Sequence, residues 1–240
     1  MTNVERKIFE CSLPQNNGTS CPVACKFKAN NPNEKRPIPE AYLGNLRSKF
    51  MIIGINPGAK ENYIGKNGED GEEKKKNFVE GKSFEEYQKW IREHVPSFWQ
   101  YNYVAQIFGY SLRNGEGIVT NLIHCPTPGW SVQKDETWRL SDVEKQKSLE
   151  LCSPFCIEMV DEVNPELVLL HSLDVVKFFS NYCGWGIGEN AENKDIHGLV
   201  KRCNNRTFVL SRHLRSMCFK RGQGAWKPLE EVARNIKRNR

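Results

Sequence analysis

Four short apolar runs, each followed by polar residues, most strongly limit what this chain can fold into. They are residues 49–55, 117–123, 166–170 and 207–211. Each run has the length and the apolar composition of a buried strand. Helical patterns lie between and after the runs, over residues 83–94, 96–109, 141–163, 173–182 and 228–238. Because strands and helices alternate, we predict an α/β fold: a three-layer α/β/α sandwich around a central, mostly parallel sheet of four or five strands.

Local signals set the ends of two of the predicted helices. Ser141 and Glu144 form a capping box at the start of the longest one, and Pro165 follows its end. Ser83 and Glu86 form a second capping box, which opens an earlier helix. These signals predict where the strands are connected, and they support the alternating pattern.

The length of 240 residues fits one domain over 1–240, with an irregular N-terminal arm over 1–45 that is rich in turn residues. No segment approaches the ~18–20 apolar residues of a membrane span. The first ten residues are charged and contain no apolar signal region. We therefore expect an intracellular monomer without a membrane partner, cytoplasmic and associated with the nucleoid if it is prokaryotic.

Basic residues are concentrated in the last sixth of the chain. Residues 201–240 contain 12 Lys and Arg against two acidic residues, whereas residues 1–200 contain 23 basic and 27 acidic residues. This asymmetry favours a polyanionic partner, most simply nucleic acid. The last segment, 228–238, also has the charge pattern of an ordinary solvated helix, which needs no ligand. The more informative basic residues surround a histidine: Arg212, Arg215, Lys220 and Arg221.

Nine cysteines are many for a chain without a secretory signal, where disulfides are not expected. They fall into two groups and a scattered set: Cys11, Cys21 and Cys25; Cys125, Cys152 and Cys156; and Cys183, Cys203 and Cys218. The two groups fit either a zinc or iron–sulfur site or reduced structural thiols. The scattered set fits ordinary buried thiols.

Polar residues follow each of the predicted strands. Asn56 follows the first, Asn121 and His124 end the second, and His171 and His213 follow the third and fourth. In an open parallel sheet, ligands bind beyond the carboxyl ends of the strands. Because four strands deliver amide or imidazole groups to one edge, this edge is the candidate active site.

The loop after the first strand, residues 54–58 (GINPG), limits the chemistry. It lacks the Gly-Lys-Ser/Thr ending of a phosphate loop, and it holds one carboxamide, that of Asn56, on a rigid turn. A carboxamide can orient water but is not a strong base, so the leaving group must depart largely by itself. Cleavage of an N-glycosidic bond is such a reaction, and His213 could stabilise the departing base.

Three segments together resemble the uracil-DNA glycosylase superfamily. Residues 54–58 look like the first catalytic motif of its mismatch-specific branch. Residues 118–129 (IVTNLIHCPTPG) are similar to a strand and loop of its iron–sulfur branch, where an Asn reads the flipped uracil and a Cys four residues later binds the cluster. Residues 152–155 (CSPF) resemble the setting of another cluster cysteine. The resemblance covers roughly residues 49–221 and implies one uracil-DNA-glycosylase-like domain.

The resemblance implies a role for each matched residue. Asn56 would position the attacking water, and His213 would stabilise the leaving base. The base itself would be bound by Ile55, Gly58, Phe78 and Asn121, with the Phe ring stacking and the Asn pairing with the base edge.

The same resemblance implies a cofactor and a DNA partner. A structural [4Fe–4S] cluster would be held by Cys21, Cys25, Cys125 and Cys152, although zinc would use the same ligands. DNA would be contacted by Arg212, Arg215, Lys220 and Arg221, in a loop that presses into the minor groove while the base is extruded.

Several residues depart from the family pattern. Leu214 follows His213 where the family usually has proline, and His171 stands where a small residue is expected. The cysteine spacings are also wider, so Cys11 or Cys156 could replace a proposed ligand. The tyrosine that excludes thymine is absent, so the pocket can admit a larger or modified base.

We therefore expect a monofunctional DNA glycosylase of base-excision repair that hydrolyses the N-glycosidic bond of uracil or a related base and leaves an abasic site. One alternative is a member of the superfamily that binds nucleic acid without catalysis. Another is a glycosylase for a hypermodified base in foreign DNA. A metal-dependent redox or radical protein is the weakest alternative, because the cysteines are dispersed and no second cofactor motif is present.

Overall fold

The computed structural model describes residues 3–11, 21–23, 25, 42–55, 96–125, 140–188, 190–214 and 223–238. The chain divides into two compact units. The first comprises residues 1–42, 56–89 and 120–161, and the second comprises residues 43–55, 90–119 and 162–240. Each unit is described by itself below.

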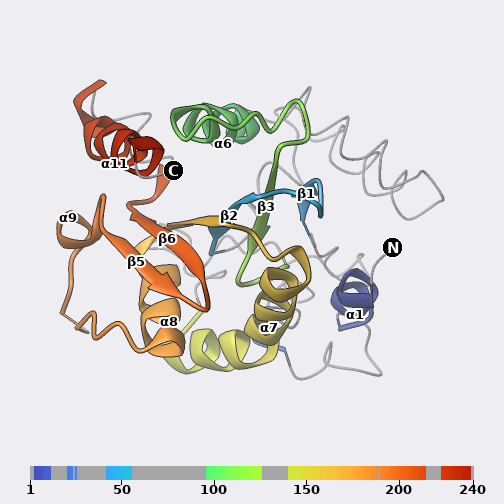
Figure 1. Cartoon of the computed structure of the whole chain (residues 1–240). Coiled ribbons are helices and arrows are strands. Elements are labelled where there is room, and N and C mark those ends of the chain that lie inside the picture. Colours follow the sequence, from blue (N-terminus) through green and yellow to red (C-terminus); the bar gives the residue numbers. More distant parts are fainter. Residues whose placement is uncertain are drawn as a thin grey trace. The chain divides into compact units, whose positions relative to one another are not determined.

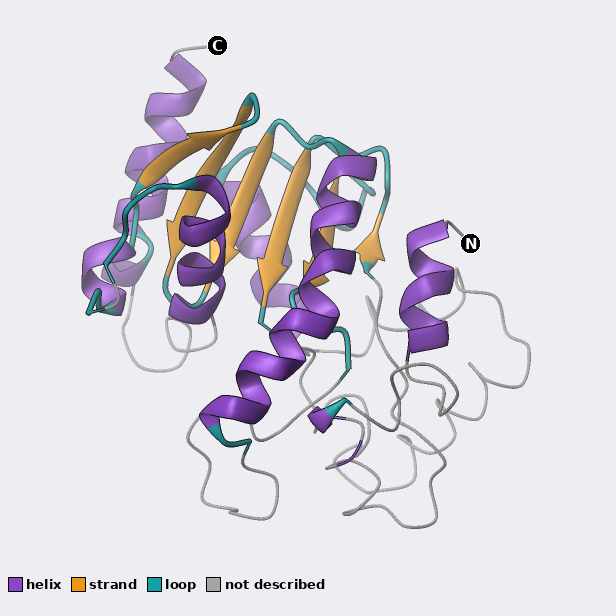
Figure 2. Ribbon diagram, turned by 90° about the horizontal axis from the view of Figure 1, so that it is seen from below, coloured by secondary structure: helices purple, strands orange, loops and turns teal. Residues whose placement is uncertain are grey.

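The second unit is built on a mixed sheet of six strands in the order β1-β3-β2-β4-β6-β5 (Figures 1 and 2). The strands are β1 (Leu43–Gly44), β2 (Phe50–Gly54), β3 (Gly117–Asn121), β4 (Leu167–His171), β5 (Val200–Cys203) and β6 (Arg206–Ser211). β4 runs parallel to β2 and to β6, whereas β1 pairs antiparallel with β3 and β5 pairs antiparallel with β6. Every residue of β2 and β4 is buried, as is typical of parallel strands covered on both faces.

The α/β fold with a mostly parallel sheet is confirmed, but the expected number of strands was too low. The sheet has six strands rather than four or five, because β1 and β5 extend it at its two edges. β1 has two residues, and β5 alternates exposed with half-buried positions. Neither contains the continuous apolar run by which the other four strands were recognised. The three-layer arrangement over the whole chain stays a prediction.

The helices of the second unit follow the sequence pattern closely. They are α6 (Pro96–Ile107), α8 (Leu173–Cys183), the short α9 (Asn193–Ile196), the 3-10 helix η3 (Gln223–Ala225) and α11 (Lys227–Arg238). α6, α8 and α11 were predicted within one or two residues of these bounds. α9 and η3 have four and three residues, too short for a periodic apolar pattern to show.

One core of the second unit lies between one face of the sheet and helices α6 and α11. Its side chains come from alternate strand positions and from the two helices: Phe50, Ile52, Leu167, Leu169 and Val209 with Val104, Phe108, Leu229 and Ala233. Alternate residues of a strand point to the same face, so Phe208 points to the opposite face. There its ring lies 5.7 Å from that of Phe179 of α8. Helices therefore pack on both faces of this sheet.

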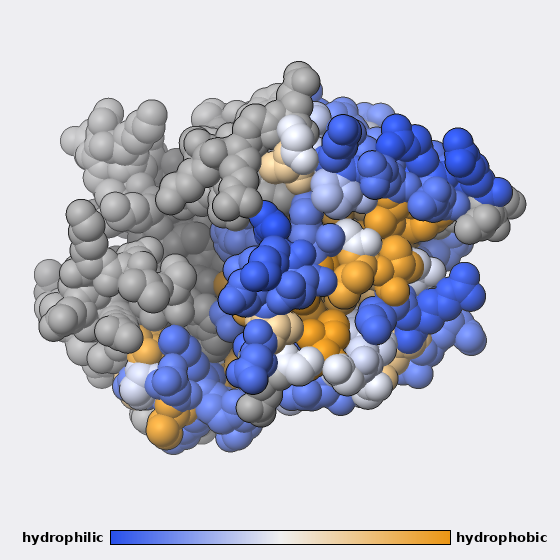
Figure 3. Space-filling view, turned by 90° about the vertical axis from the view of Figure 1, so that its left-hand side faces the viewer, coloured by the Kyte–Doolittle hydropathy of each residue, from blue (hydrophilic) through white to orange (hydrophobic). Residues whose placement is uncertain are grey.

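The β5 edge of the sheet carries exposed apolar side chains beside basic ones. Leu199 and Val200 are 41% and 45% exposed, and Lys201 and Arg202 follow them. Figure 3 shows a mostly hydrophilic face with an apolar patch among blue side chains. Charged residues on an edge strand hinder its pairing with another chain.

The first unit contains α1 (Asn3–Cys11) and most of α7 (Asp142–Val163). α1 corrects the expectation of an irregular arm over 1–45, since its residues form a regular helix. Val4 and Ile8 are buried and lie one turn apart on the same face. Lys7 Nζ lies 2.6 Å from Glu158 Oε1 of α7. The ion pair links α1 to α7, and the charged composition of the segment concealed its two buried apolar residues.

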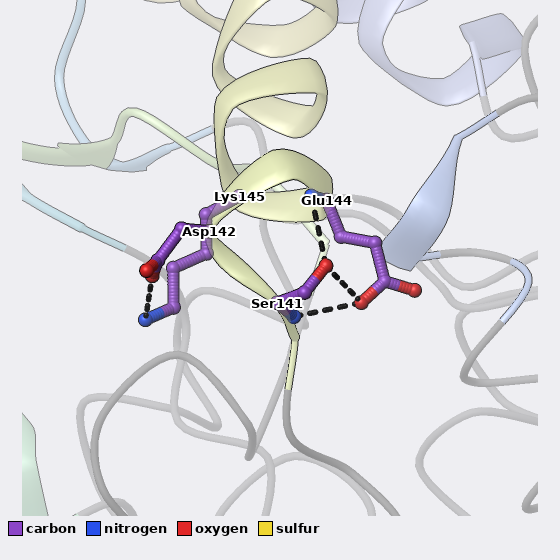
Figure 4. A network of polar contacts seen from close by, with 4 residues as sticks. All are labelled: Ser141, Asp142, Glu144 and Lys145. Carbon is purple, nitrogen blue, oxygen red and sulfur yellow. Dashed lines mark hydrogen bonds and ion pairs between the residues drawn. The ribbon is translucent and has the colours of Figure 1, made fainter.

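The predicted capping box at the start of α7 is confirmed (Figure 4). The backbone N–H of Ser141 donates to Glu144 Oε2 at 2.7 Å, and the backbone N–H of Glu144 donates to Ser141 Oγ at 3.2 Å. The second predicted capping box, Ser83 with Glu86, lies outside the described residues. None of the helices in the described part of the chain is long and apolar enough to cross a membrane.

Candidate functional site

The carboxyl ends of the parallel strands β4 and β6 bring polar side chains together in the second unit. His171, the last residue of β4, pairs with Ser211, the last residue of β6. Ser172 follows His171 directly, and all three residues are buried. His213 lies two residues beyond β6 and is exposed. The site therefore extends from a buried floor to an exposed histidine.

The two histidines of this edge are in ring contact. The ring centroid of His171 lies 5.3 Å from that of His213, and the planes cross at 74°. The ring of Tyr101, on α6, lies 5.6 Å from that of His171 on the same face of the sheet. The sequence predicted that His171 and His213 share one edge, and the structure brings their rings together there.

His171 is held in its neutral form. Burial, together with the neighbouring His213, lowers its pKa well below the ordinary value of a histidine. Its side chain is 3% exposed, and neither ring nitrogen has a hydrogen-bond partner among the residues that the structure describes. A neutral imidazole has one N–H donor and one acceptor nitrogen, so His171 has one unmet group of each kind.

Ser172 adds a third polar atom and an unusual backbone. Its Oγ is buried and, within the described ranges, has no hydrogen-bond partner. Its φ of 103° lies in a region that residues with a Cβ rarely adopt, and it precedes α8 without a side-chain capping bond. Its backbone N–H donates to the Ser211 carbonyl at 3.1 Å, which holds the end of β4 against β6.

The neighbouring Arg212 is tied to α9. Its Nε donates to the Asn193 carbonyl at 3.1 Å, and its backbone N–H donates to His197 Nδ1 at 3.4 Å. His197 Nε2 donates to the Ala225 carbonyl at 2.9 Å, so Nδ1 is the acceptor of a neutral ring. Burial lowers the pKa of His197, in agreement with that state.

Leu214 explains the departure from the His-Pro pattern after β6. Its side chain is buried and belongs to the core between the sheet and helices α6 and α11. A proline there would lack most of this apolar contact. Because Leu214 directly follows His213, its burial fixes the position of the backbone next to the exposed histidine.

Thiols from separate segments converge in the first unit. Cys21 and Cys11 both lie close enough to Cys152 to raise its pKa, in addition to the larger effect of burial. The backbone of His124 donates a hydrogen bond to Cys152. Cys125, next to His124, is buried as well. The structure thus brings segments carrying Cys11, Cys21, Cys125 and Cys152 to one region of this unit.

The remaining cysteines of the two groups differ in their surroundings. The backbone N–H of Cys25 donates to the Cys21 carbonyl at 3.0 Å, so the two residues lie one helical turn apart, and Cys25 is exposed. Cys156 lies one turn after Cys152 on α7, and burial raises its pKa. Of the two possible substitute ligands, Cys11 interacts electrostatically with Cys152.

Thiols are the donors that a soft metal site would use. Cysteine thiolates bind both zinc and iron–sulfur clusters, and hydrogen bonds to the sulfurs from backbone N–H groups are typical of clusters. In the described ranges, which include all of the proposed cysteine ligands, no group of three or more His, Cys, Asp or Glu residues is placed so that it could hold a metal ion. The observation that bears on such a site is the electrostatic effect of Cys11 and Cys21 on Cys152.

The other predicted site residues have the following places. Ile55, directly after β2, and Asn121, the last residue of β3, are both buried. Six predicted residues lie outside the described part of the chain: Asn56, Gly58, Phe78, Arg215, Lys220 and Arg221. Their assigned roles stay predictions.

Sequence reasoning missed several polar residues near these sites. Tyr101 lies in a helix with little amphipathic pattern, and serine gives no sequence signal for the positive φ of Ser172.

Cys183 and Cys203, which were expected to be scattered, are hydrogen-bonded to each other. Burial and this hydrogen bond raise the pKa of Cys183 to about 12.

No protein-family model matches the sequence, and none of the curated proteins compared with it is similar.

Proposed function

We propose that the chain is a monofunctional DNA glycosylase for uracil or a related base. The observation that carries the proposal is the meeting of exposed His213 with buried, neutral His171 at the carboxyl ends of adjacent parallel strands. This edge is where α/β enzymes bind ligands. A neutral imidazole beside a histidine suits a reaction whose leaving group needs hydrogen bonds rather than a strong base.

In the proposed reaction, the bond between C1′ of the deoxyribose and the ring nitrogen of the base breaks. Its electron pair departs with the base, while water supplies the hydroxyl group at C1′ and the proton that the base takes up. Asn56 would position the water, and Ile55, Gly58, Phe78 and Asn121 would bind the flipped base. His213 would stabilise the negative charge on the departing base. The products are a free base and an abasic site.

The thiols of the first unit support a structural cofactor in this proposal. Four thiolates from among Cys11, Cys21, Cys25, Cys125 and Cys152 would hold a [4Fe–4S] cluster, or zinc with the same ligands. The bound group would cross-link distant segments of the chain. No step of the proposed reaction passes through it.

The charge of the chain supports DNA as the partner. The excess of Lys and Arg over residues 201–240 includes Arg212, and the proposed contacts of Arg215, Lys220 and Arg221 lie in the same segment. We propose that the protein acts on DNA as a monomer inside the cell. A hypermodified base in foreign DNA is the alternative substrate.

A cleavage assay tests this function. A labelled oligonucleotide carries one uracil, in a single strand or opposite G or A, and strand breakage is measured with and without heat and alkali. We expect breakage that requires alkali, with loss of activity of about 10²-fold or more in Asn56→Ala and His213→Ala. Asn114→Ala, at an exposed turn residue, serves as the matched control and keeps full activity.

Two outcomes would contradict the proposal. Absence of breakage in every context, from folded and metal-loaded protein, would remove uracil as a substrate. DNA binding that persists without any cleavage, and that does not depend on Asn56, would favour the non-catalytic alternative.

A further inference from the structure

We propose that His171 and Ser172 bind the amide edge of a neutral, planar base at the carboxyl end of β4, and thereby determine which base the enzyme accepts; the second half of this inference rests on the proposed glycosylase function. Nothing in the family resemblance assigns this position, where a small residue is expected. The inference rests on three features of the described residues.

The first feature is a set of unmet polar atoms on adjacent residues. His171 Nδ1, His171 Nε2 and Ser172 Oγ are all buried, and in the described part of the chain they have no hydrogen-bond partner. Each buried, unpaired polar group lowers the free energy of unfolding, because its hydrogen bonds to water are lost and not replaced. Apolar side chains of similar size would avoid this cost, so the atoms are best explained by a ligand that satisfies them.

The second feature is the small size of the residues beside His171 in the sheet. In the β2–β4 register, Ile53 pairs with Leu170, so Gly54 lies level with His171. On the other side, Ser211 pairs with His171. Residues level with one another in a parallel sheet point to the same face. His171 is therefore flanked within the sheet by a glycine and a serine, two of the smallest residues.

The third feature is the kind of ligand that fits these atoms. The neutral His171 ring offers one donor and one acceptor, and the Ser172 hydroxyl offers a further donor or acceptor. An amide edge, –CO–NH–, presents the complementary acceptor and donor, as uracil and hypoxanthine do. A neutral imidazole offers no charge to a phosphate, although the start of α8 favours partial negative charge such as that of a carbonyl oxygen.

The strained backbone of Ser172 agrees with this role. A φ of 103° in a serine costs folding free energy and is tolerated where it holds a functional group in place. The Ser172 N–H bond to the Ser211 carbonyl fixes that conformation. The hydroxyl of Ser172 does not cap α8, so it remains available to a ligand.

Three variants of the full-length protein test the inference. His171→Leu and Ser172→Ala remove the proposed contacts. Ser180→Ala is the matched control, because Ser180, near the end of α8, is also a buried serine, and its Oγ accepts a hydrogen bond from the Ile187 N–H at 3.0 Å. Melting temperature, cleavage of uracil DNA, and thermal stabilisation by free uracil at millimolar concentration are measured for each protein.

We expect opposite effects on stability and binding. His171→Leu should melt at the wild-type temperature or above, because two unpaired polar atoms are removed. It should nevertheless lose about tenfold or more in kcat/KM on uracil DNA, together with the stabilisation by uracil. Ser180→Ala should melt lower and keep both functions.

The outcomes separate this inference from the proposed function. Wild-type cleavage of uracil DNA with an unchanged rate and uracil stabilisation in His171→Leu would overturn the inference and leave the function standing. Stabilisation by uracil that depends on His171, without cleavage of any substrate, would support the base-binding site and contradict the proposed glycosylase activity. Stabilisation of wild type by inorganic phosphate and not by uracil would overturn the inference in favour of an anion site.

Discussion

Burial of the titratable His171 side chain makes the stability of the fold depend on pH. Its pKa lies below that of the unfolded state, so below about pH 6.5 the unfolded chain binds a proton that the folded chain does not. Stability is therefore present above that pH and is lost as the pH falls, with a slope of up to about 1.4 kcal/mol per pH unit for one group. His197, whose pKa burial also lowers, acts in the same direction.

The first prediction follows from this loss of stability at acid pH. The free energy of unfolding, from urea titrations at pH 7.5 and pH 5.5, should fall less in His171→Leu than in wild type, by about 1 kcal/mol. A variant of an exposed charged residue, Glu116→Gln, is the control for general effects of the acid pH. If the acid loss of His171→Leu equals that of wild type, His171 is not the neutral buried group described above.

A second residue-scale prediction compares two glycines with positive φ. Gly44 has a φ of 113°, and a Cβ there would collide with the carbonyl oxygen of Gly117 in the neighbouring strand. Gly115 has a φ of 74° and meets no atom closer than 3.9 Å. Gly115→Ala should therefore cost about 1–2 kcal/mol from backbone strain alone, and Gly44→Ala distinctly more. Equal losses in urea unfolding would show that β1 moves aside without cost.

At the scale of elements, the start of α7 makes a separate contribution to stability. The Ser141 hydroxyl accepts from the Glu144 N–H and donates to Glu144 Oε2 at 2.9 Å (Figure 4). Ser141→Ala should lower the free energy of unfolding by about 1 kcal/mol, and Ser141→Asp should keep most of it because Asp is also a good N-cap. A loss of equal size in both variants would mean that the box does not stabilise the helix. Chemical denaturation at neutral pH measures both.

Elements with strong local signals were predicted, and elements that depend on tertiary contacts were not. β2 and β4 are continuous apolar runs, so their existence and burial followed from composition. α1 depends on Val4 and Ile8 packing in the first unit, and β5 depends on pairing with β6, which no local pattern reveals. The same division holds for the sites. The strand ends predicted that His171 and His213 share an edge, but the strain at Ser172 and the approach of Cys11 to Cys152 arise from packing.

At the scale of the molecule, the first unit has few described elements, and its thiols offer a way to hold distant segments together. The Lys7–Glu158 ion pair is part-exposed at 2.6 Å and contributes at most about 1 kcal/mol. A metal or cluster that binds thiolates of the folded chain stabilises it by its binding free energy. The N-terminal segment should therefore depend on the bound group more than on its ion pair.

The last prediction uses the two cysteines that could replace a proposed ligand. Cys11→Ser should lower iron or zinc content per chain and the melting temperature, because Cys11 interacts with Cys152. Cys156→Ser should keep the metal, since burial is the cause of its raised pKa, and Cys183→Ser serves as a control at a thiol of the other unit. Iron, zinc and acid-labile sulfide are measured on anaerobically purified protein, and acid-labile sulfide distinguishes a cluster from zinc. Metal loss in Cys156→Ser with full retention in Cys11→Ser would make Cys156 the substitute ligand and leave α1 without a role in the site.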